Sequence, residues 1–176
     1  MLRFLPALLL ATPALAEGGG FVEDPLVLED YGVVCEVELQ GRRAAPGTES
    51  GLLNIIDQQR EIDVTTRAVP AEIGLSFGIR ATLEPGHVIE DLRVVVEHPP
   101  MGPNAVTVER WDAEANAGTT MVNLFTFEHD YERVQGKWVF RLMSGADTLL
   151  EQRFVVFPAG TVPAVQQACF GAKLMG

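Results

Sequence analysis

Hydrophobic and polar residues alternate along several short segments of the chain. The clearest case places Trp138, Phe140 and Leu142 on one face of an extended strand. Turn-forming residues follow at 144–147, and a second run rich in aromatic and β-branched residues occupies 149–157. This pattern predicts a β-hairpin. Because two strands alone bury too little apolar surface, other strands must cover the Trp138 face.

The same period of two predicts strands in other parts of the chain. We expect them at residues 31–39, 62–66, 74–83, 92–97, 106–111 and 121–128. Loops rich in glycine and proline separate them, among them 41–51 and 98–103, and segment 52–62 fits either a strand or a helical turn. No long amphipathic helix is predicted. The fold class is therefore all-β, an immunoglobulin-like β-sandwich of seven or eight strands.

The N-terminus has the features of an export signal. Arg3 precedes an apolar run, and the small residues Ala14 and Ala16 stand at the two positions that a signal peptidase reads. The run is shorter than the roughly 20 residues that a membrane-spanning helix needs. We expect residues 1–16 to be a signal peptide, 17–30 a flexible leader, and 31–176 a single sandwich domain with a C-terminal tail. The predicted location is the periplasm, with secretion as the alternative.

The charge of the chain argues against two classes of partner. The full sequence has 13 basic and 24 acidic residues, and removal of the signal peptide takes away only Arg3, which leaves 12 and 24 and a net charge of −12. Nucleic acids and anionic membrane surfaces select basic clusters. We therefore expect no nucleic-acid binding and no stable membrane insertion. The acidic residues are dispersed, as on an ordinary solvated surface.

Cys35 and Cys169 are the only two cysteines of the chain. Export brings a protein into an oxidising compartment, so an even pair predicts a disulfide. Residues 163–170 fit one helical turn ended by Gly171, which would bring Cys169 back against the body. Neither cysteine has the neighbours of a redox motif or a metal site.

Ser76 lies in a Gly-x-Ser-x-Gly string that matches the nucleophile elbow of serine hydrolases. In those enzymes the serine occupies a sharp turn between a strand and a helix. Here the alternation continues through the string as far as Leu83, and a Pro-Gly turn at 84–86 leaves no room for a helix. We expect Ser76 to be structural, with Gly74 and Gly78 allowing close packing around Phe77. A small serine hydrolase stays an alternative.

The segment around His98 supplies the remaining candidates. His98 and Met101 are a histidine and a thioether, ligand types that suit copper, although such a site needs more ligands. We predict no bound metal and no cofactor, and a metal-handling role is a second alternative. Three prolines restrict the backbone of residues 98–104. Pro99, Pro100 and Met101, together with Trp111, are our candidate apolar contact patch for a partner protein.

Several short strings in a fixed order resemble a bacterial domain-of-unknown-function family of small exported proteins, number 3859 of its series. The resemblance would cover about residues 29–157 and supports a single domain. It implies no activity, cofactor or catalytic residue. The strings are Tyr31-Gly-Val-Val-Cys35, Val69-Pro-Ala-Glu-Ile-Gly-Leu-Ser-Phe-Gly78, Val96-Glu-His-Pro-Pro100, Trp111, Gly136-Lys-Trp-Val-Phe140 and Gln152-Arg-Phe-Val-Val156.

No motif in the sequence specifies a chemistry. Strands, turns and a covalent link are predicted, but no assembled reactive group. We therefore expect a non-enzymatic periplasmic module that binds or interacts with another periplasmic protein.

Overall fold

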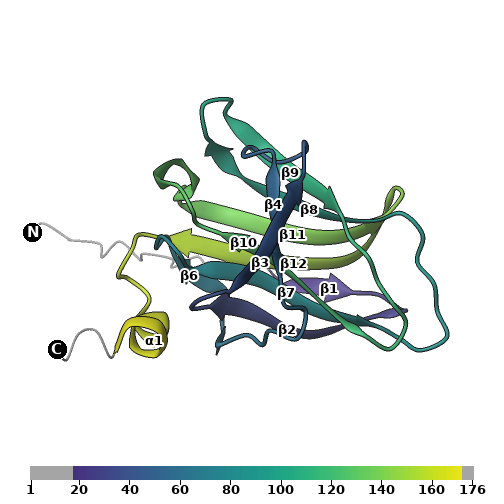
Figure 1. Ribbon diagram of the computed structural model, residues 1–176. Coiled ribbons are helices and arrows are strands. Elements are labelled where there is room, and N and C mark those ends of the chain that lie inside the picture. Colours follow the sequence, from purple (N-terminus) through teal and green to yellow (C-terminus); the bar gives the residue numbers. More distant parts are fainter. Residues whose placement is uncertain (1–17, 172–176) are drawn as a thin grey trace, which may run out of the picture.

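Two β-sheets pack face to face in the computed structural model, which describes residues 18–171 (Figure 1). The expected signal peptide, residues 1–16, lies outside this range. The first sheet has the order β1-β12-β11-β8-β9, and β6 pairs in parallel with β12. Its strands are β1 (Gly20–Val22), β6 (Ala68–Pro70), β8 (Leu92–Met101), β9 (Val106–Asp112), β11 (Gly136–Ser144) and β12 (Asp147–Phe157).

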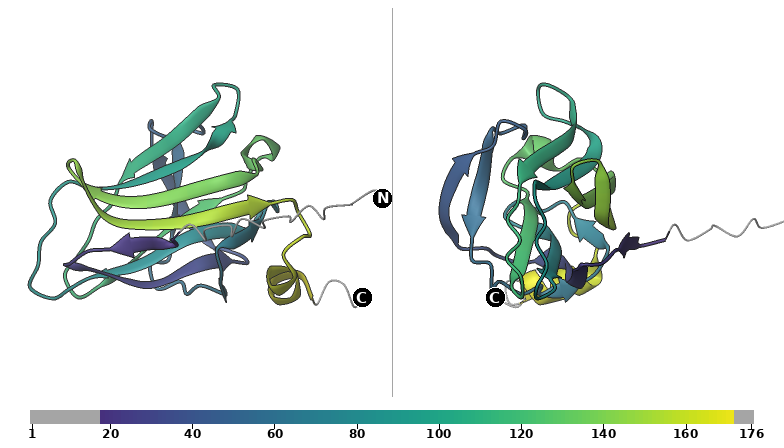
Figure 2. Two further views of the ribbon diagram at one scale, coloured as in Figure 1. Left: turned by 180° about the vertical axis from the view of Figure 1, so that it is seen from behind. Right: turned by 90° about the vertical axis from the view of Figure 1, so that its right-hand side faces the viewer.

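The second sheet is smaller and has the order β10-β7-β2-β5. Its strands are β2 (Leu26–Val34), β5 (Val64–Thr65), β7 (Ser76–Leu83) and β10 (Thr120–Thr126). A separate hairpin of β3 (Leu39–Ala44) and β4 (Leu52–Ile56) stands beside both sheets, as the right-hand view of Figure 2 shows. The helical turns are η1 (Asp130–Glu132), α1 (Pro163–Val165) and η2 (Gln166–Phe170).

The predicted all-β sandwich is confirmed, and so is its central hairpin. Strands β11 and β12 pair antiparallel through the turn at 144–147, and Trp138, Phe140 and Leu142 are completely buried. Phe77 on β7 faces them from the second sheet, with its ring centroid 5.4 Å from that of Trp138. The alternation of apolar residues thus marks the faces that the two sheets bury against each other.

Several boundaries differ from those expected. Strand β1 lies within the segment expected to be a leader, residues 17–30, and pairs with β12, while β2 begins at Leu26 instead of at residue 31. Segment 41–51 was expected to be a loop, but β3 extends to Ala44. Glycines obscure β1 and β3 in the sequence, because a strand that contains them lacks the side chains that display the period of two.

The proline-rich segment also departs from the prediction. It does not end its strand, because β8 continues through Pro99 and Pro100 to Met101. The register against β9 is irregular between Glu97 and Met101, as at a β-bulge. Proline lacks a backbone donor and is tolerated where the ladder is interrupted, so the bulge accommodates both prolines.

The predicted disulfide joins Cys35, just after β2, to Cys169 in η2, and their Cα atoms are 5.1 Å apart. Pro163 begins the helical turn, as expected, and the side chain of Val165 is completely buried. The C-terminal turn is therefore fixed to the second sheet by a covalent bond and by apolar packing.

Loss of the disulfide should destabilise the fold. The two cysteines are 134 residues apart in sequence, and closing a loop of that length stabilises a protein by about 5 kcal/mol in the chain-entropy model. We expect Cys35→Ser to lower the free energy of unfolding by up to that amount in urea titrations. The exported wild-type protein should have an intact mass about two daltons below the reduced value. Free thiols at both positions would contradict the assignment.

Candidate functional site

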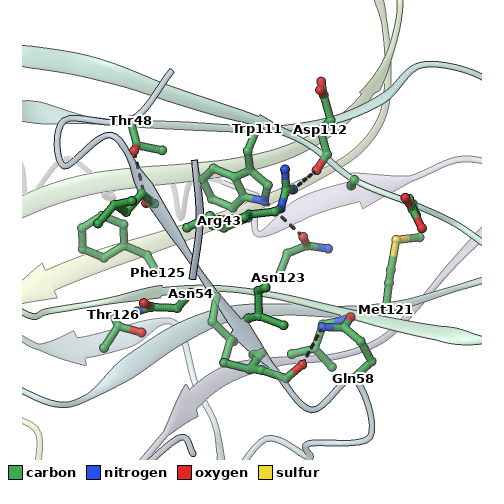
Figure 3. Close-up of a pocket in the computed structure, with 18 of the residues that line it drawn as sticks. Arg43, Thr48, Asn54, Gln58, Trp111, Asp112, Met121, Asn123, Phe125 and Thr126 are labelled. Atoms are coloured by element: carbon green, nitrogen blue, oxygen red, sulfur yellow. Dashed lines mark hydrogen bonds between the residues drawn. The ribbon is translucent and has the colours of Figure 1, made fainter. Parts of the chain in front are cut away.

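A cavity of about 630 Å³ lies between the β3–β4 hairpin and the neighbouring strands β9 and β10 (Figure 3). Polar contacts hold the hairpin in place around this space. The backbone carbonyl of Gly47 accepts a hydrogen bond from the Arg110 amide at 2.9 Å, and Arg43 donates to the carbonyl of Asp112 at 2.6 Å. The volume is typical of a binding pocket for a small ligand or a side chain.

A second set of contacts attaches the hairpin to the other side of the cavity. The side chain of Gln58 accepts a hydrogen bond from the backbone amide of Val122 on β10 at 2.8 Å. Arg42 forms an ion pair with Glu128 at 2.7 Å. The hairpin therefore bonds to β9 directly and to the β10 region through Gln58, which follows β4, and through Glu128, which follows β10. Because it adds to neither ladder, it spans the opening at this side of the sandwich and leaves space beneath it.

The cavity wall combines apolar side chains with amides. Leu53, Trp111, Met121 and Phe125 supply apolar surface from three strands. The indole N–H of Trp111 donates to the side-chain oxygen of Asn123 at 3.4 Å, which ties the ring to β10 (Figure 3). Such a mixture is typical of ligand sites, in which apolar area supplies affinity and a few polar groups supply orientation.

Two buried carboxyl groups also line the cavity. Glu109 is only 4% exposed, and its Oε1 accepts a hydrogen bond from the backbone amide of Glu49 at 2.7 Å. Burial is the main cause that raises the pKa of Glu109 to about 7; the hydrogen bond from Glu49 opposes the shift, and the nearby carboxylates of Glu132 and Glu49 add to it. No described lysine or arginine forms an ion pair with Glu109.

Glu132 caps the short turn η1. Its Oε2 accepts hydrogen bonds from the backbone amides of Glu128 and His129, at 2.6 and 2.8 Å. Burial raises the pKa of this carboxyl above its ordinary value, and the two amide donors oppose the shift. The Glu132 carboxyl group therefore has a structural role as a cap, and it is also one of the acidic groups in the cavity wall.

The structure does not bring the four residues of the expected contact patch together on the surface. Pro100 is exposed, but Met101 is 2% exposed and belongs to the core, and Trp111 is 7% exposed. The irregularity in β8 explains Met101, since the alternation of the strand is interrupted between Glu97 and Met101 and the Met101 side chain faces the core. Of the four residues, only Trp111 lines the cavity.

His98 is also buried, with its ring centroid 4.6 Å from that of Trp138. Its Nδ1 lies 2.8 Å from the carbonyl oxygen of Pro99, and because a carbonyl only accepts, Nδ1 carries the proton. Nε2 has no partner among the described residues. Burial lowers the pKa of His98. Within residues 18–171, no group of three or more histidine, cysteine, aspartate and glutamate side chains is arranged to hold a metal ion.

Ser76 lies at the start of β7, within the sheet, and its side chain is completely buried. Its hydroxyl is 2.7 Å from that of Thr126 on β10. A Cβ atom at Gly78 would collide with the backbone carbonyl of Asn123, so this glycine permits the close approach of β10. The Gly-x-Ser-x-Gly string therefore has a packing explanation and lacks the turn of a nucleophile elbow.

Sequence reasoning missed Glu109 as a site residue. Glu109 precedes Trp111 by two positions, so in a strand both side chains point to the same face. Trp111 was assigned to a contact patch on the surface, and a carboxyl group on the face of an exposed strand is ordinary. Once the Trp111 face is recognised as buried, an acidic residue on it becomes a signal for a functional site.

Comparisons with known proteins agree with this architecture. The family model described as a domain of unknown function (DUF3859) matches residues 26–156. Among solved structures, the chain is similar to an immunoglobulin-like protein from Pseudomonas aeruginosa, with 24% sequence identity and a TM-score of 0.51, over 81% of this chain and 99% of that chain. At this identity the similarity concerns the fold alone. A comparison with curated proteins finds no match.

Replacement of Glu109 by glutamine should change how stability depends on pH. The carboxyl has a pKa of about 7 in the folded protein, against an ordinary value of 4.5. The folded state therefore holds the proton more tightly, and stability falls as pH rises from 4.5 to 7. This effect is worth up to about 3 kcal/mol. Glutamine keeps an acceptor for the Glu49 amide but does not titrate. Glu109→Gln should therefore flatten the slope of stability against pH.

Urea unfolding at pH 5 and pH 8 measures the slope. Exposed Glu90 lies outside the cavity lining, so Glu90→Gln is the matched control and should keep the wild-type slope. If Glu109→Gln retained the full pH dependence of the wild type, the slope would arise from other groups, such as Glu132.

Ser76→Ala should affect stability but no hydrolytic activity. The substitution leaves the Thr126 hydroxyl without its partner, which costs about 1 to 3 kcal/mol at a buried position. Thermal unfolding and hydrolysis of p-nitrophenyl acetate measure the two properties. An esterase activity of the wild type that disappeared in a correctly folded Ser76→Ala variant would establish the hydrolase alternative.

Proposed function

Because the chain belongs to the DUF3859 family of domains of unknown function, we propose that it is a non-enzymatic binding module. In this proposal, the binding site is the cavity beneath the β3–β4 hairpin and the ligand is part of another exported protein. The cavity itself carries the proposal, because apolar surface, amides and two buried carboxyl groups converge on one space of about 630 Å³.

The disulfide supports a location outside the reducing cytoplasm, in the periplasm or the external medium. The sequence pattern at residues 1–16 supports export in the same way. None of the helices within residues 18–171 is long and apolar enough to cross a bilayer. The net negative charge argues for a protein partner over nucleic acid or an anionic membrane.

The absence of an accessible nucleophile at Ser76 also favours binding over catalysis. Its hydroxyl is enclosed between β7 and β10 and is hydrogen-bonded to the hydroxyl of Thr126. A nucleophile needs an adjacent base and access to substrate. Ser76 lacks both in the part of the chain that the structure describes.

Filling the cavity should abolish partner binding. Leu53 lines the cavity, and Leu53→Trp would place a bulky indole ring in it. Val88 is 84% exposed and outside the lining, so Val88→Trp is the matched control. A photo-crosslinking amino acid at Ile55, on the cavity rim, should capture a protein partner in cells. We expect Leu53→Trp to remove this crosslink and Val88→Trp to retain it.

Two results would decide against the cavity. Crosslinks that persist in a Leu53→Trp variant with a wild-type melting temperature would show that binding occurs elsewhere. Crosslinks from a photoreactive residue at exposed Pro100, but not from Ile55, would place the partner on the proline-rich segment.

A further inference from the structure

We propose that the cavity binds a lysine or arginine side chain, which an extended segment of the partner protein presents along the free edge of β10. This inference rests on the proposed function, because it names the ligand of the same cavity. Four features of the cavity support it: the acidic lining, the open hydrogen-bonding position of Glu109, the apolar walls beside that carboxyl group, and the strand edges around the cavity.

The charged residues that line the cavity are predominantly acidic. Five carboxyl groups face a single guanidinium, that of Arg43. Arg43 donates its described hydrogen bond to a backbone carbonyl, and Arg42 from outside the lining neutralises Glu128. Neither arginine forms an ion pair with the buried carboxyl groups. The lining carboxyl groups belong to Glu109, Asp112, Glu114, Glu128 and Glu132.

Glu109 has a hydrogen-bonding position open to a ligand. Its Oε1 accepts from the Glu49 amide, whereas Oε2 has no donor among the described residues. A carboxylate this deeply buried is costly unless it is paired with a cation. An incoming ammonium or guanidinium group would provide that cation and would form a charge-assisted hydrogen bond with Oε2.

The neighbouring walls suit the rest of a basic side chain. Trp111 and Phe125 line the same cavity as Glu109, together with aliphatic Leu53. Aromatic faces attract cations, and apolar surface accommodates the methylene stem that separates a lysine ammonium from its backbone. A metal ion has no hydrocarbon stem and would make no contact with these apolar walls.

Strand edges around the cavity favour a polypeptide over a free amine. In the described part of the chain, β4, β9 and β10 each pair with one neighbouring strand only. The Val122 amide points away from β7 and donates to the side chain of Gln58, a hydrogen bond that an added segment would have to replace. Strand alternation places the Leu124 amide on the same edge of β10. An extended segment can add to such an edge, and its side chains then enter the adjacent pockets.

A set of three peptides tests the inference. Capped pentapeptides of sequence Thr-Val-X-Val-Thr carry lysine, norleucine or glutamate as X. Norleucine keeps the aliphatic stem of lysine and lacks the charge. By isothermal titration calorimetry, the lysine peptide should bind about tenfold to a hundredfold more tightly than the norleucine peptide, because hydrogen bonds to charged groups contribute about that much. The glutamate peptide should not bind.

Two variants locate the effect. Glu109→Gln should remove most of the preference for lysine over norleucine, whereas Glu90→Gln, outside the cavity, should retain it. Equal binding of the lysine and norleucine peptides, or no binding of the lysine peptide, would overturn the inference. If the lysine and norleucine peptides bound equally and Leu53→Trp abolished the binding of both, the cavity would still be a binding site and the proposed function would stand.

A free amine tests whether the partner segment adds to β10 as a strand. n-Butylamine carries the same ammonium and stem without a peptide backbone. It should compete for the cavity at least tenfold more weakly than the lysine peptide, by about 1.4 kcal/mol or more. Equal affinities would show that the site takes free amines and that β10 does not receive a strand.

Discussion

The packing of Phe77 is the interaction on which the sandwich depends. Its ring lies 5.4 Å from Trp138 and 5.3 Å from Phe154, both on the opposite sheet, and 5.9 Å from Phe125 on the neighbouring strand. Aromatic side chains bury the largest areas of any residues, so this cluster sets the spacing of the two sheets. The next residue, Gly78, lets β10 approach β7 closely enough to complete the cluster.

The cavity is a consequence of how the sandwich is closed. The aromatic cluster fills the space between the sheets, and on one side β2 contacts strands of the first sheet, including β12. On the other side, the β3–β4 hairpin lies across β9 and β10 without pairing with either. The side chains of Arg43 and Gln58 and one backbone hydrogen bond, from Arg110 to Gly47, connect it to these strands. The pocket is the space that this arrangement leaves.

Glu109 lies at a position where stability alone would favour an apolar residue. Trp111, on the same face of β9, shows what the core accepts there. A buried carboxyl group with a pKa of about 7 and no described basic partner reduces the stability of the fold at neutral pH. Residues that violate the packing rules in this way concentrate at functional sites, which is why the cavity, and not the proline-rich segment, is the centre of the proposal.

Features that depend on local pattern, or on chemistry with few possible outcomes, can be read from the amino-acid sequence alone. The alternation around Trp138 identified a buried strand face, and two cysteines can form only one intramolecular pair. The order of short strings identified the family, which the match over residues 26–156 confirms. Each inference needed only neighbouring residues or a count.

The depth at which each residue is buried and the pairing of distant strands depend on the folded structure. Met101 and Pro100 are adjacent, yet one is buried and the other exposed, because a bulge in β8 interrupts the alternation. The pairing of β1 with β12 and the position of the β3–β4 hairpin join segments far apart in the chain. A strand's period of two shows which residues share a face but not what covers that face. The burial of Glu109 and the cavity beside it follow from that covering and from nothing local.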